Sequence, residues 1–173
     1  MSFGDPRSLP HTLSFAPNIL YNSNNIYSPS FFFYQCRGLY RIYNLPDFHN
    51  YNSTSFMFYE CTNLNQNIFK YLNLEKLSYV ENASYMFSYM NNFNQDNIHL
   101  NFNNTDLSYL FKGCHNLCAN NWNIIANNIK NGYSMFSEDK MILNSNFYFH
   151  SENIASLGYC FNNCICDNVN IYS

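Results

Sequence analysis

The segment SFMFYECTNL, residues 55–64, decides the fold, because related segments recur along the chain with a phenylalanine in the same place. We call each copy a Phe box. The boxes begin at Ser30, Ser55, Ser84, Ser108, Tyr133 and Gly158. The fourth residues of the boxes, which carry the register, are Phe33, Phe58, Phe87, Phe111, Phe136 and Phe161. Successive key phenylalanines lie 25, 29, 24, 25 and 25 residues apart. Such a period indicates a repeat protein, in which stacked units bury a common core.

A second column lies three residues after each key phenylalanine. It holds Cys36, Cys61, Met90, Cys114, Asp139 and Cys164. Reduced cysteine packs as a small apolar side chain, and methionine fills irregular apolar space. We therefore predict that the six key phenylalanines stack inside the repeat, together with the four cysteines and the methionine of this column.

Two local patterns alternate within each repeat. In the box, apolar residues such as Met86, Phe87 and Met90 have helical spacing, which predicts a single helical turn or a short 3₁₀ piece. Further along, apolar and polar residues alternate, as in Trp122-Asn123-Ile124, which predicts a short strand. The longest repeat holds about four extra residues near Leu72–Leu77, in NLEKLSYV, the most helix-prone stretch of the chain. Insertions of this kind usually map to a loop on one face.

An asparagine precedes the first large apolar residue of most predicted strands. These asparagines are Asn67, Asn97, Asn121 and Asn146. Because asparagine side chains bond readily to nearby backbone groups, we expect this column to bond to the backbone of the neighbouring repeat. Such a role would explain part of the 33 asparagines in the chain.

Together these patterns predict an α/β repeat, a short leucine-rich-repeat-like solenoid of about six coils of roughly 25 residues. Each coil is expected to hold one short parallel strand and one short helical turn. The solenoid is expected to span residues 26–173. Residues 1–25 lie outside the repeat and are expected to form either an N-terminal cap or an arm that docks on a larger assembly.

The box and its continuation resemble a known repeat family. MFYECTNLNQ at residues 57–66 and MFSYMNNFNQ at residues 86–95 resemble the BspA-type leucine-rich repeat. More narrowly, they resemble the DUF285 repeat of mycoplasma-type surface proteins, from Ile26 to the C-terminus. The resemblance implies a repeat protein used for binding or adhesion, and it carries over no catalytic residue.

Composition argues against several classes of protein. Charged residues make up 11% of the chain and the net charge is −3, so nothing favours a nucleic acid or an anionic membrane as partner. The hydrophobic content of 47% is enough for a folded core. The N-terminus shows no secretory signal, and no stretch is long and apolar enough for a transmembrane helix. We therefore expect no membrane insertion and a cytoplasmic location, unless the protein is part of a virion.

Two cysteine clusters loosely resemble metal sites: CHNLC at residues 114–118 and CFNNCIC at residues 160–166. Structural zinc sites are built from paired cysteine or histidine elements, whereas Cys114 and Cys164 belong to the predicted core column. We expect no metal, no cofactor and no catalytic residue. A thiol or zinc enzyme, in which a histidine activates a cysteine, is the remote alternative.

The strands also predict a candidate binding surface. If each strand turns its first large apolar residue inward, the next residue points outward. These outward residues are Tyr43, Phe69, His99, Asn123 and Tyr148. Rigid aromatics mixed with small amides are typical of binding surfaces. The alternative is that such residues only keep a Tyr- and Asn-rich repeat in solution.

These observations favour a non-enzymatic binding or structural protein. A repeat with few charges suits a component of a larger particle. We expect a phage or viral virion protein, such as a surface or tail element that attaches to the host. The alternative is a bacterial or protist BspA-like adhesin or an intracellular interaction module. The expected partners are proteins of a larger assembly, or a protein or glycan of a host surface.

Overall fold

The computed structural model describes most of the repeat region: residues 28–43, 45, 48, 51–65, 67–72, 74–139, 142–143, 148–153, 155–164 and 170–172. The predicted cap or arm at residues 1–25 lies outside the described residues, as do Asn146 and Cys166. Among the helices that the structure describes, none has the length and apolar character needed to cross a membrane.

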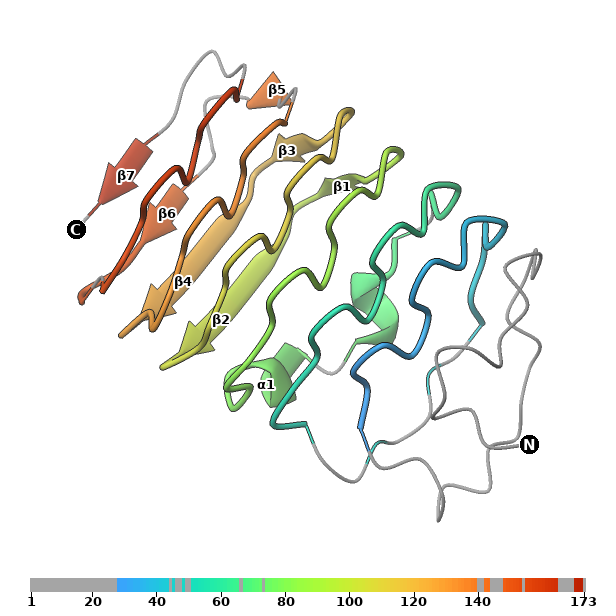
Figure 1. Ribbon diagram of the computed structural model, residues 1–173, viewed down its shortest axis with the longest axis horizontal. Coiled ribbons are helices and arrows are strands. Elements are labelled where there is room, and N and C mark those ends of the chain that lie inside the picture. Colours follow the sequence, from blue (N-terminus) through green and yellow to red (C-terminus); the bar gives the residue numbers. More distant parts are fainter. Residues whose placement is uncertain are drawn as a thin grey trace.

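In the described part of the chain, short strands form two sheets whose pairings are all parallel. The three-stranded sheet has the order β1-β3-β5, with β1 at Asn94–Asp96, β3 at Cys118–Asn120 and β5 at Ile142–Leu143. The four-stranded sheet has the order β2-β4-β6-β7, with β2 at His99–Asn103, β4 at Asn123–Asn127, β6 at Tyr148–His150 and β7 at Asn170–Tyr172. Each strand pairs with its counterpart in the next repeat (Figure 1).

The strands of the larger sheet have one buried face. In β2, Leu100 and Phe102 are buried, whereas His99 and Asn103 are exposed. β4 alternates in the same way. This period of two is that of a strand that packs one face against a core.

The Phe boxes form runs of turns. In every box, the residues two before and two after the key phenylalanine have φ between 54° and 71°. This left-handed conformation costs a non-glycine residue roughly 1–2 kcal/mol, and it interrupts a right-handed helix. The hydrogen bonds inside a box span three residues, as from the N–H of Met86 to the carbonyl of Ala83 at 3.2 Å. A 3₁₀ helix makes bonds of the same span, but the left-handed residues interrupt each box, so these are turn bonds and the helical turn predicted for each box is wrong.

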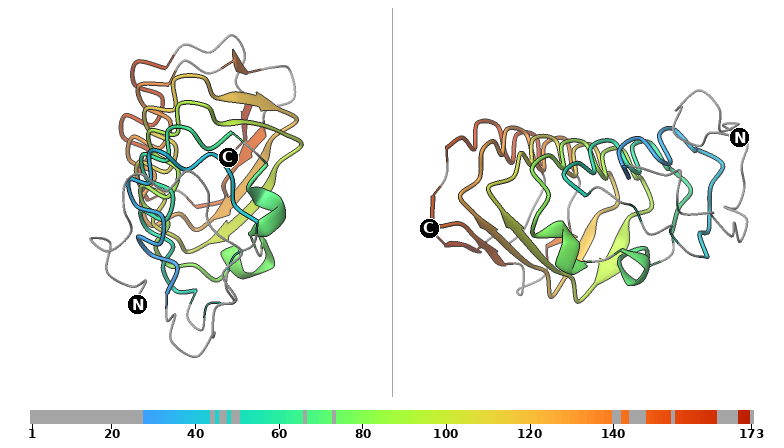
Figure 2. Two further views of the ribbon diagram at one scale, coloured as in Figure 1. Left: turned by 90° about the vertical axis from the view of Figure 1, so that its right-hand side faces the viewer. Right: turned by 90° about the horizontal axis from the view of Figure 1, so that it is seen from below.

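Alternate N–H groups of each box donate to the next box. The N–H groups of Tyr85, Phe87 and Tyr89 donate to three alternate carbonyls of the following box, at 3.1, 3.0 and 2.8 Å. The same three bonds join every successive pair of boxes, at 2.8–3.1 Å. They satisfy backbone groups that turns would otherwise leave unpaired, which offsets the cost of the left-handed residues. Figure 2 shows the boxes as a regular row of short loops along one side, opposite the strands.

The key phenylalanines stack through the core. Neighbouring ring centroids lie 5.3–5.9 Å apart, with ring planes within 21° of each other. The buried members are Phe33, Phe58, Phe87, Phe111 and Phe136. Phe161, at the end of the stack, is partly exposed. These rings contribute apolar area that one repeat buries against the next.

The neighbouring column is buried beside the stack. Its buried members are Cys36, Cys61, Met90, Cys114 and Asp139, and Cys164 at the end is half-buried. The thiol of Cys114 donates to the carbonyl of Phe87 at 3.1 Å, and the thiol of Cys61 donates to that of Phe33 at 3.1 Å. A cysteine at this place therefore adds a weak hydrogen bond to its apolar packing.

The longest repeat contains both helices that the structure describes. They are the 3₁₀ helix η2, Phe69–Tyr71, and the α-helix α1, Leu74–Leu77. Helix α1 thus lies in the stretch that the sequence marks as the most helix-prone, where the extra residues of this repeat were expected. Helix α1 contacts β2 and lies on the side of β2 away from β4 (Figure 1).

The predicted fold class, an α/β leucine-rich-repeat-like solenoid with a strand and a helical turn in each coil, is wrong. The described residues are strand and turn, with only a four-residue and a three-residue helix. The physical reason is the left-handed residues of the boxes, which replace helix by turns. The named strands, moreover, begin only in the third repeat, at Asn94.

Asparagine side chains bond to neighbouring backbone, but in a different column from the predicted one. They lie five residues after the key phenylalanine and donate to the preceding repeat: Asn63 to Arg37, Asn92 to Thr62 and Asn116 to Asn91, at 2.8–3.0 Å. Asn67 instead accepts from the N–H of Phe69 at 3.1 Å. These bonds tie successive boxes together at their exposed ends.

Candidate functional site

Three of the five predicted surface residues form one row across the larger sheet. His99 of β2 pairs with Asn123 of β4, which pairs with Tyr148 of β6. His99 and Tyr148 are exposed, and Asn123 is half-buried. We call the outward side of these strands the polar face. It consists of His99, Asn101, Asn103, Asn123, Ile125, Asn127, Tyr148 and His150.

The other two predicted surface residues lie elsewhere. Tyr43 is 50% exposed and lies outside the named strands. Phe69 is buried, so its place on a binding surface is wrong. It lies in η2, where the tight turn directs both Ile68 and Phe69 inward, and its ring centroid lies 5.5 Å from that of Phe87.

Asparagine amides border the polar face at both ends of the strands. Before the strands, Nδ2 of Asn121 donates to Oδ1 of Asn97 at 2.9 Å. After them, Asn128 donates to Asn103 at 3.3 Å, and Asn153 donates to Asn128 at 2.9 Å. Asn128 donates one N–H and accepts one bond on Oδ1, so its amide retains hydrogen-bonding capacity for a further partner.

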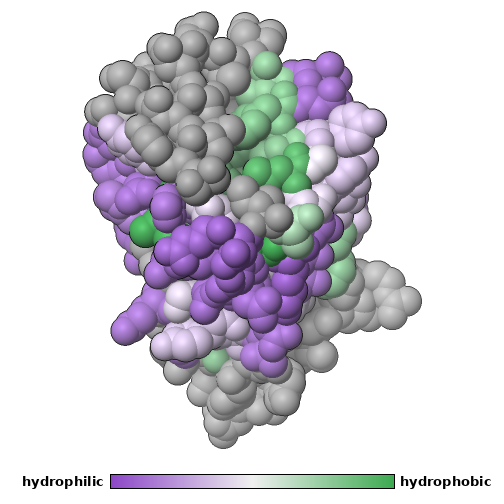
Figure 3. Space-filling model, turned by 90° about the vertical axis from the view of Figure 1, so that its left-hand side faces the viewer, coloured by the Kyte–Doolittle hydropathy of each residue, from purple (hydrophilic) through white to green (hydrophobic). Residues whose placement is uncertain are grey.

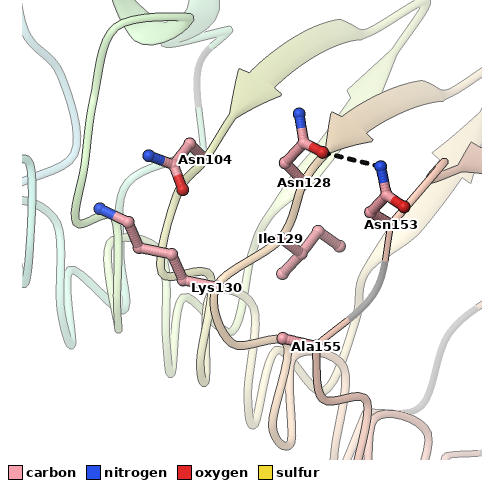
Figure 4. Close-up of a pocket in the computed structure, with 6 residues that line it drawn as sticks. All are labelled: Asn104, Asn128, Ile129, Lys130, Asn153 and Ala155. Atoms are coloured by element: carbon pink, nitrogen blue, oxygen red, sulfur yellow. Dashed lines mark hydrogen bonds between the residues drawn. The ribbon is translucent and has the colours of Figure 1, made fainter.

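A groove of about 460 Å³ lies where β2, β4 and β6 end (Figure 4). Its lining residues are Asn104, Asn128, Ile129, Lys130, Asn153 and Ala155. Asn104 and Asn128 have φ of 55° and 53°, a conformation that asparagine tolerates better than most residues. The same asparagines therefore turn the chain and place amides beside the groove, while Lys130 extends on the Asn104 side (Figure 4).

The groove and the polar face carry little charge. Lys130 is the charged residue among those that line the groove, and its Nζ lies 3.6 Å from Oε2 of Glu81. Both side chains are largely exposed, so this ion pair is weak. The eight residues of the polar face include no acidic residue, lysine or arginine. A ligand of this surface would therefore be selected by hydrogen bonding and shape rather than by charge.

The buried thiols are poor nucleophiles. Burial raises the pKa of Cys36 to about 11 and the pKa of Cys160 to about 12. Burial also raises the pKa values of Cys61 and Cys114 well above the ordinary range. The reactive form of cysteine is the thiolate, which these four residues do not reach near neutral pH.

Asp139 occupies the cysteine position of the fifth box and is 1% exposed. Its Oδ1 accepts from the N–H of Cys114 at 2.6 Å, while its buried Oδ2 has no hydrogen-bond partner among the described residues. Burial raises the pKa of Asp139 to about 8, against the opposing effect of bonds from the N–H groups of Cys114 and Gly113. The carboxyl group therefore titrates near neutral pH inside the core.

The two cysteine clusters do not assemble a metal site in the described part of the chain. No group of three or more His, Cys, Asp or Glu side chains there is placed to hold a metal ion. Cys114 is in the core, and Cys164 lies at the end of the same column. The zinc-enzyme alternative thus has no candidate centre among the described residues.

A second row of stacked aromatics lies on the box side, and sequence reasoning missed it. Phe31, Phe56, Tyr85 and Tyr109 stack with centroids 4.4–4.8 Å apart and planes within 16°. Their rings are partly exposed. The second residue of a box is aromatic in five of the six copies, which is the signal that would have predicted this row.

The parallel strands, the boxes and the polar face together define a repeat protein whose polar face carries no acidic residue, lysine or arginine. The family model described as "Mycoplasma protein of unknown function, DUF285" matches residues 20–148 and, in an overlapping match, residues 76–172. The chain therefore belongs to the DUF285 family, and the resemblance seen in the boxes is confirmed. No curated protein and no solved structure matches the chain. Family membership adds no support for a virion component.

Proposed function

We propose that the chain is a non-enzymatic binding protein that holds a protein partner on the polar face and in the adjoining groove. The observation that carries the proposal is the row of His99, Asn123 and Tyr148, which lie in register on three neighbouring strands. Because the strands are one repeat apart, equivalent side chains are presented at the regular strand spacing of about 4.8 Å. Such a row suits an extended ligand that makes repeated contacts.

The amide rows favour a neutral polar ligand. Asn103, Asn128 and Asn153 form a continuous hydrogen-bonded row beside the groove, and each amide retains donor or acceptor capacity. An extended peptide offers alternating N–H and carbonyl groups, which match such amides. Charge plays a small part, because Lys130 is already near Glu81.

The side chains of the polar face favour a protein over a glycan. Ile125 and Tyr148 place apolar area among the amides and histidines. This mixture of a rigid tyrosine with adaptable amides is found in antibody paratopes, which bind proteins. The raised pKa values of the buried thiols support a function without a cysteine nucleophile.

Site-specific photo-crosslinking tests this proposal. A benzophenone amino acid replaces Tyr148 on the polar face or, as control, Tyr79, which is 75% exposed and lies beyond α1. Irradiation in the cells that express the protein is expected to give one defined protein adduct from position 148 and none from position 79. The adduct should disappear when excess unlabelled chain competes, and it should persist when the competitor is His99→Ala/Asn128→Ala.

Two results would overturn the proposal. Equal adducts from both positions would mean that the polar face has no special role. Binding to a glycan array that His99→Ala/Asn128→Ala removes, without any protein adduct, would keep the face as the site and replace the protein partner by a saccharide.

A further inference from the structure

The surface of the boxes carries a continuous band of aromatic rings, which we call the outer row. It consists of Phe31, Phe56, Tyr85, Tyr109, Tyr133 and Tyr159. From Phe31 to Tyr109 the neighbouring centroids lie 4.4–4.8 Å apart, and the centroid of Tyr133 lies 5.5 Å from those of Tyr109 and Tyr159. Phe31 and Tyr159 are exposed, and the four rings between them are half-buried. A long band of accessible aromatic surface is typical of an interaction site.

Charged side chains border the outer row. Among the described residues of the boxes, the charged side chains that reach the surface are Arg37, Glu60, Lys112 and Glu138. Nζ of Lys112 lies 3.1 Å from Oε1 of Glu138 and 5.5 Å from the ring centroid of Tyr109 in the outer row. Arg37 forms a similar ion pair with Glu60. These four side chains are 18–61% exposed, so they remain accessible to a partner. We call them the charged border.

The order of the charges along the border is self-complementary. From the first box to the fifth, the border is positive, negative, uncharged, positive and negative, with Tyr89 in the uncharged third box. Read in reverse, every charged position has the opposite sign. Two borders that run in opposite directions therefore place unlike charges together, Arg37 with Glu138 and Glu60 with Lys112. Such a match of charges favours one orientation of a contact over others.

We propose that two copies of this chain pair through their outer rows about a two-fold axis that crosses the third box. A second copy is the occupant because its charged border supplies the matching charges in the matching order. The axis pairs the first box with the fifth and the second box with the fourth, and it brings Tyr85 of one copy to Tyr85 of the other. If the two rows ran in the same direction, a two-fold axis would put the borders on opposite sides of the contact, where no unlike charges meet.

Such a contact is isologous, since both copies use the same surface, and it closes at two copies. Because the boxes lie on the side opposite the strands (Figure 2), the pair leaves both polar faces accessible. The sixth box lies beyond the paired boxes. Figure 3 looks at this end of the molecule, where hydrophobic surface lies between hydrophilic flanks that the contact does not use. Two polar faces in one assembly would hold a multivalent partner more tightly than one face does.

Sedimentation velocity of the full chain from about 1 to about 100 µM tests the proposal. We expect a single chain at the lowest concentration and a species of two copies, with nothing larger, at the highest. Two double variants test the charges: Arg37→Glu/Glu60→Lys and Lys112→Glu/Glu138→Lys. Each keeps its ion pair within the chain with the polarity reversed, but it brings like charges together across the contact. Each double variant should therefore need at least about tenfold higher concentration to pair.

Mixing the two double variants is the decisive experiment, because one restores the charges that the other reverses. The mixture is expected to form a mixed pair at the concentration that the parent chain needs, and a chain with all four substitutions should pair like the parent. The fluorescence of buried Trp122 should be the same in all variants, which shows that they are folded.

Four results would overturn the proposal. The parent chain could stay single over the whole range, or it could grow beyond two copies. A double variant could pair as readily as the parent, which would exclude the charged border from the contact. Finally, a mixture of two folded double variants could stay single, which would exclude the two-fold arrangement of the charges.

Discussion

Replacing buried Asp139 by asparagine is expected to stabilise the fold at neutral and alkaline pH. The pKa of this carboxyl group is about 8 in the folded chain, against an ordinary value of 3.8. Each pKa unit corresponds to about 1.4 kcal/mol, so full ionisation costs the folded state on the order of 6 kcal/mol. The cost arises because the side chain is 1% exposed and Oδ2 has no hydrogen-bond partner among the described residues.

The sign of the pH dependence follows from proton counting. Between about pH 4 and pH 8, Asp139 is ionised in the unfolded chain and protonated in the folded chain. The folded state then holds one proton more, so the free energy of unfolding falls by about 1.4 kcal/mol for each unit of rising pH. Below this window both states are protonated, and above it both are ionised, so the contribution levels off on either side.

The asparagine of Asp139→Asn keeps Oδ1 as acceptor for the N–H of Cys114 and does not titrate. Its new unpaired N–H group costs about 1–3 kcal/mol, which leaves a net gain of about 1–3 kcal/mol near neutral pH. Urea unfolding between about pH 4 and pH 9, followed by the fluorescence of the single Trp122, measures this difference. Glu75→Gln, at an exposed acid in α1, is the control. If Asp139→Asn shows the same slope with pH as the parent chain, the buried carboxyl is not its source.

Three further predictions test the core and the boxes. Phe87→Ala should lower the free energy of unfolding in urea by about 3–5 kcal/mol, and Phe161→Ala should lower it clearly less. The reason is that Phe87 is buried and stacked on both sides, whereas Phe161 is partly exposed. Equal losses in the two variants would contradict the phenylalanine stack. Cys114→Ser should lower the free energy of unfolding by about 1–3 kcal/mol, because it buries a hydroxyl group. Burial raises the pKa of the native Cys114 thiol, so this thiol should react with a disulfide reagent only as fast as the chain opens. Reaction at the rate of a free thiol would show that Cys114 is not buried. Gly113→Ala should lower the free energy of unfolding by about 1–3 kcal/mol, because φ is +71° and the new Cβ would clash with the ring of Tyr89. The double variant Gly113→Ala/Tyr89→Ala should show a smaller loss than the two single losses added together, and simple additivity would exclude the clash.

The period of the boxes predicted which residues form the core, but the sequence did not predict the local conformation of the boxes. The positions of Phe58, Phe87 and Phe111 follow from counting whole repeats, which does not depend on how each box folds. The helical spacing of Met86, Phe87 and Met90 misled, because Tyr85 and Tyr89 have positive φ. Residue propensity gives no reason to place tyrosine there. Gly113, which occupies the same position as Tyr89, was the visible indication of a left-handed residue.

The candidate site could be predicted only where the chain is a strand. Alternation placed His99, Asn123 and Tyr148 outward, and they do lie in one row. The same rule failed at Phe69, because the extra residues of that repeat convert the expected strand into η2. The groove was not predictable, since it depends on how Asn128 and its neighbours turn the chain after each strand.

Hydrogen exchange measured at single residues by NMR tests the pairing of successive boxes, on which the fold rests. The N–H of Phe87 donates to the carbonyl of Leu110 in the next box, whereas no described residue accepts from the N–H of Phe161. Slow exchange at Phe58, Phe87 and Phe111 together with fast exchange at Phe161 is the expected result. Exchange at Phe87 as fast as at Phe161 would contradict the pairing of the boxes.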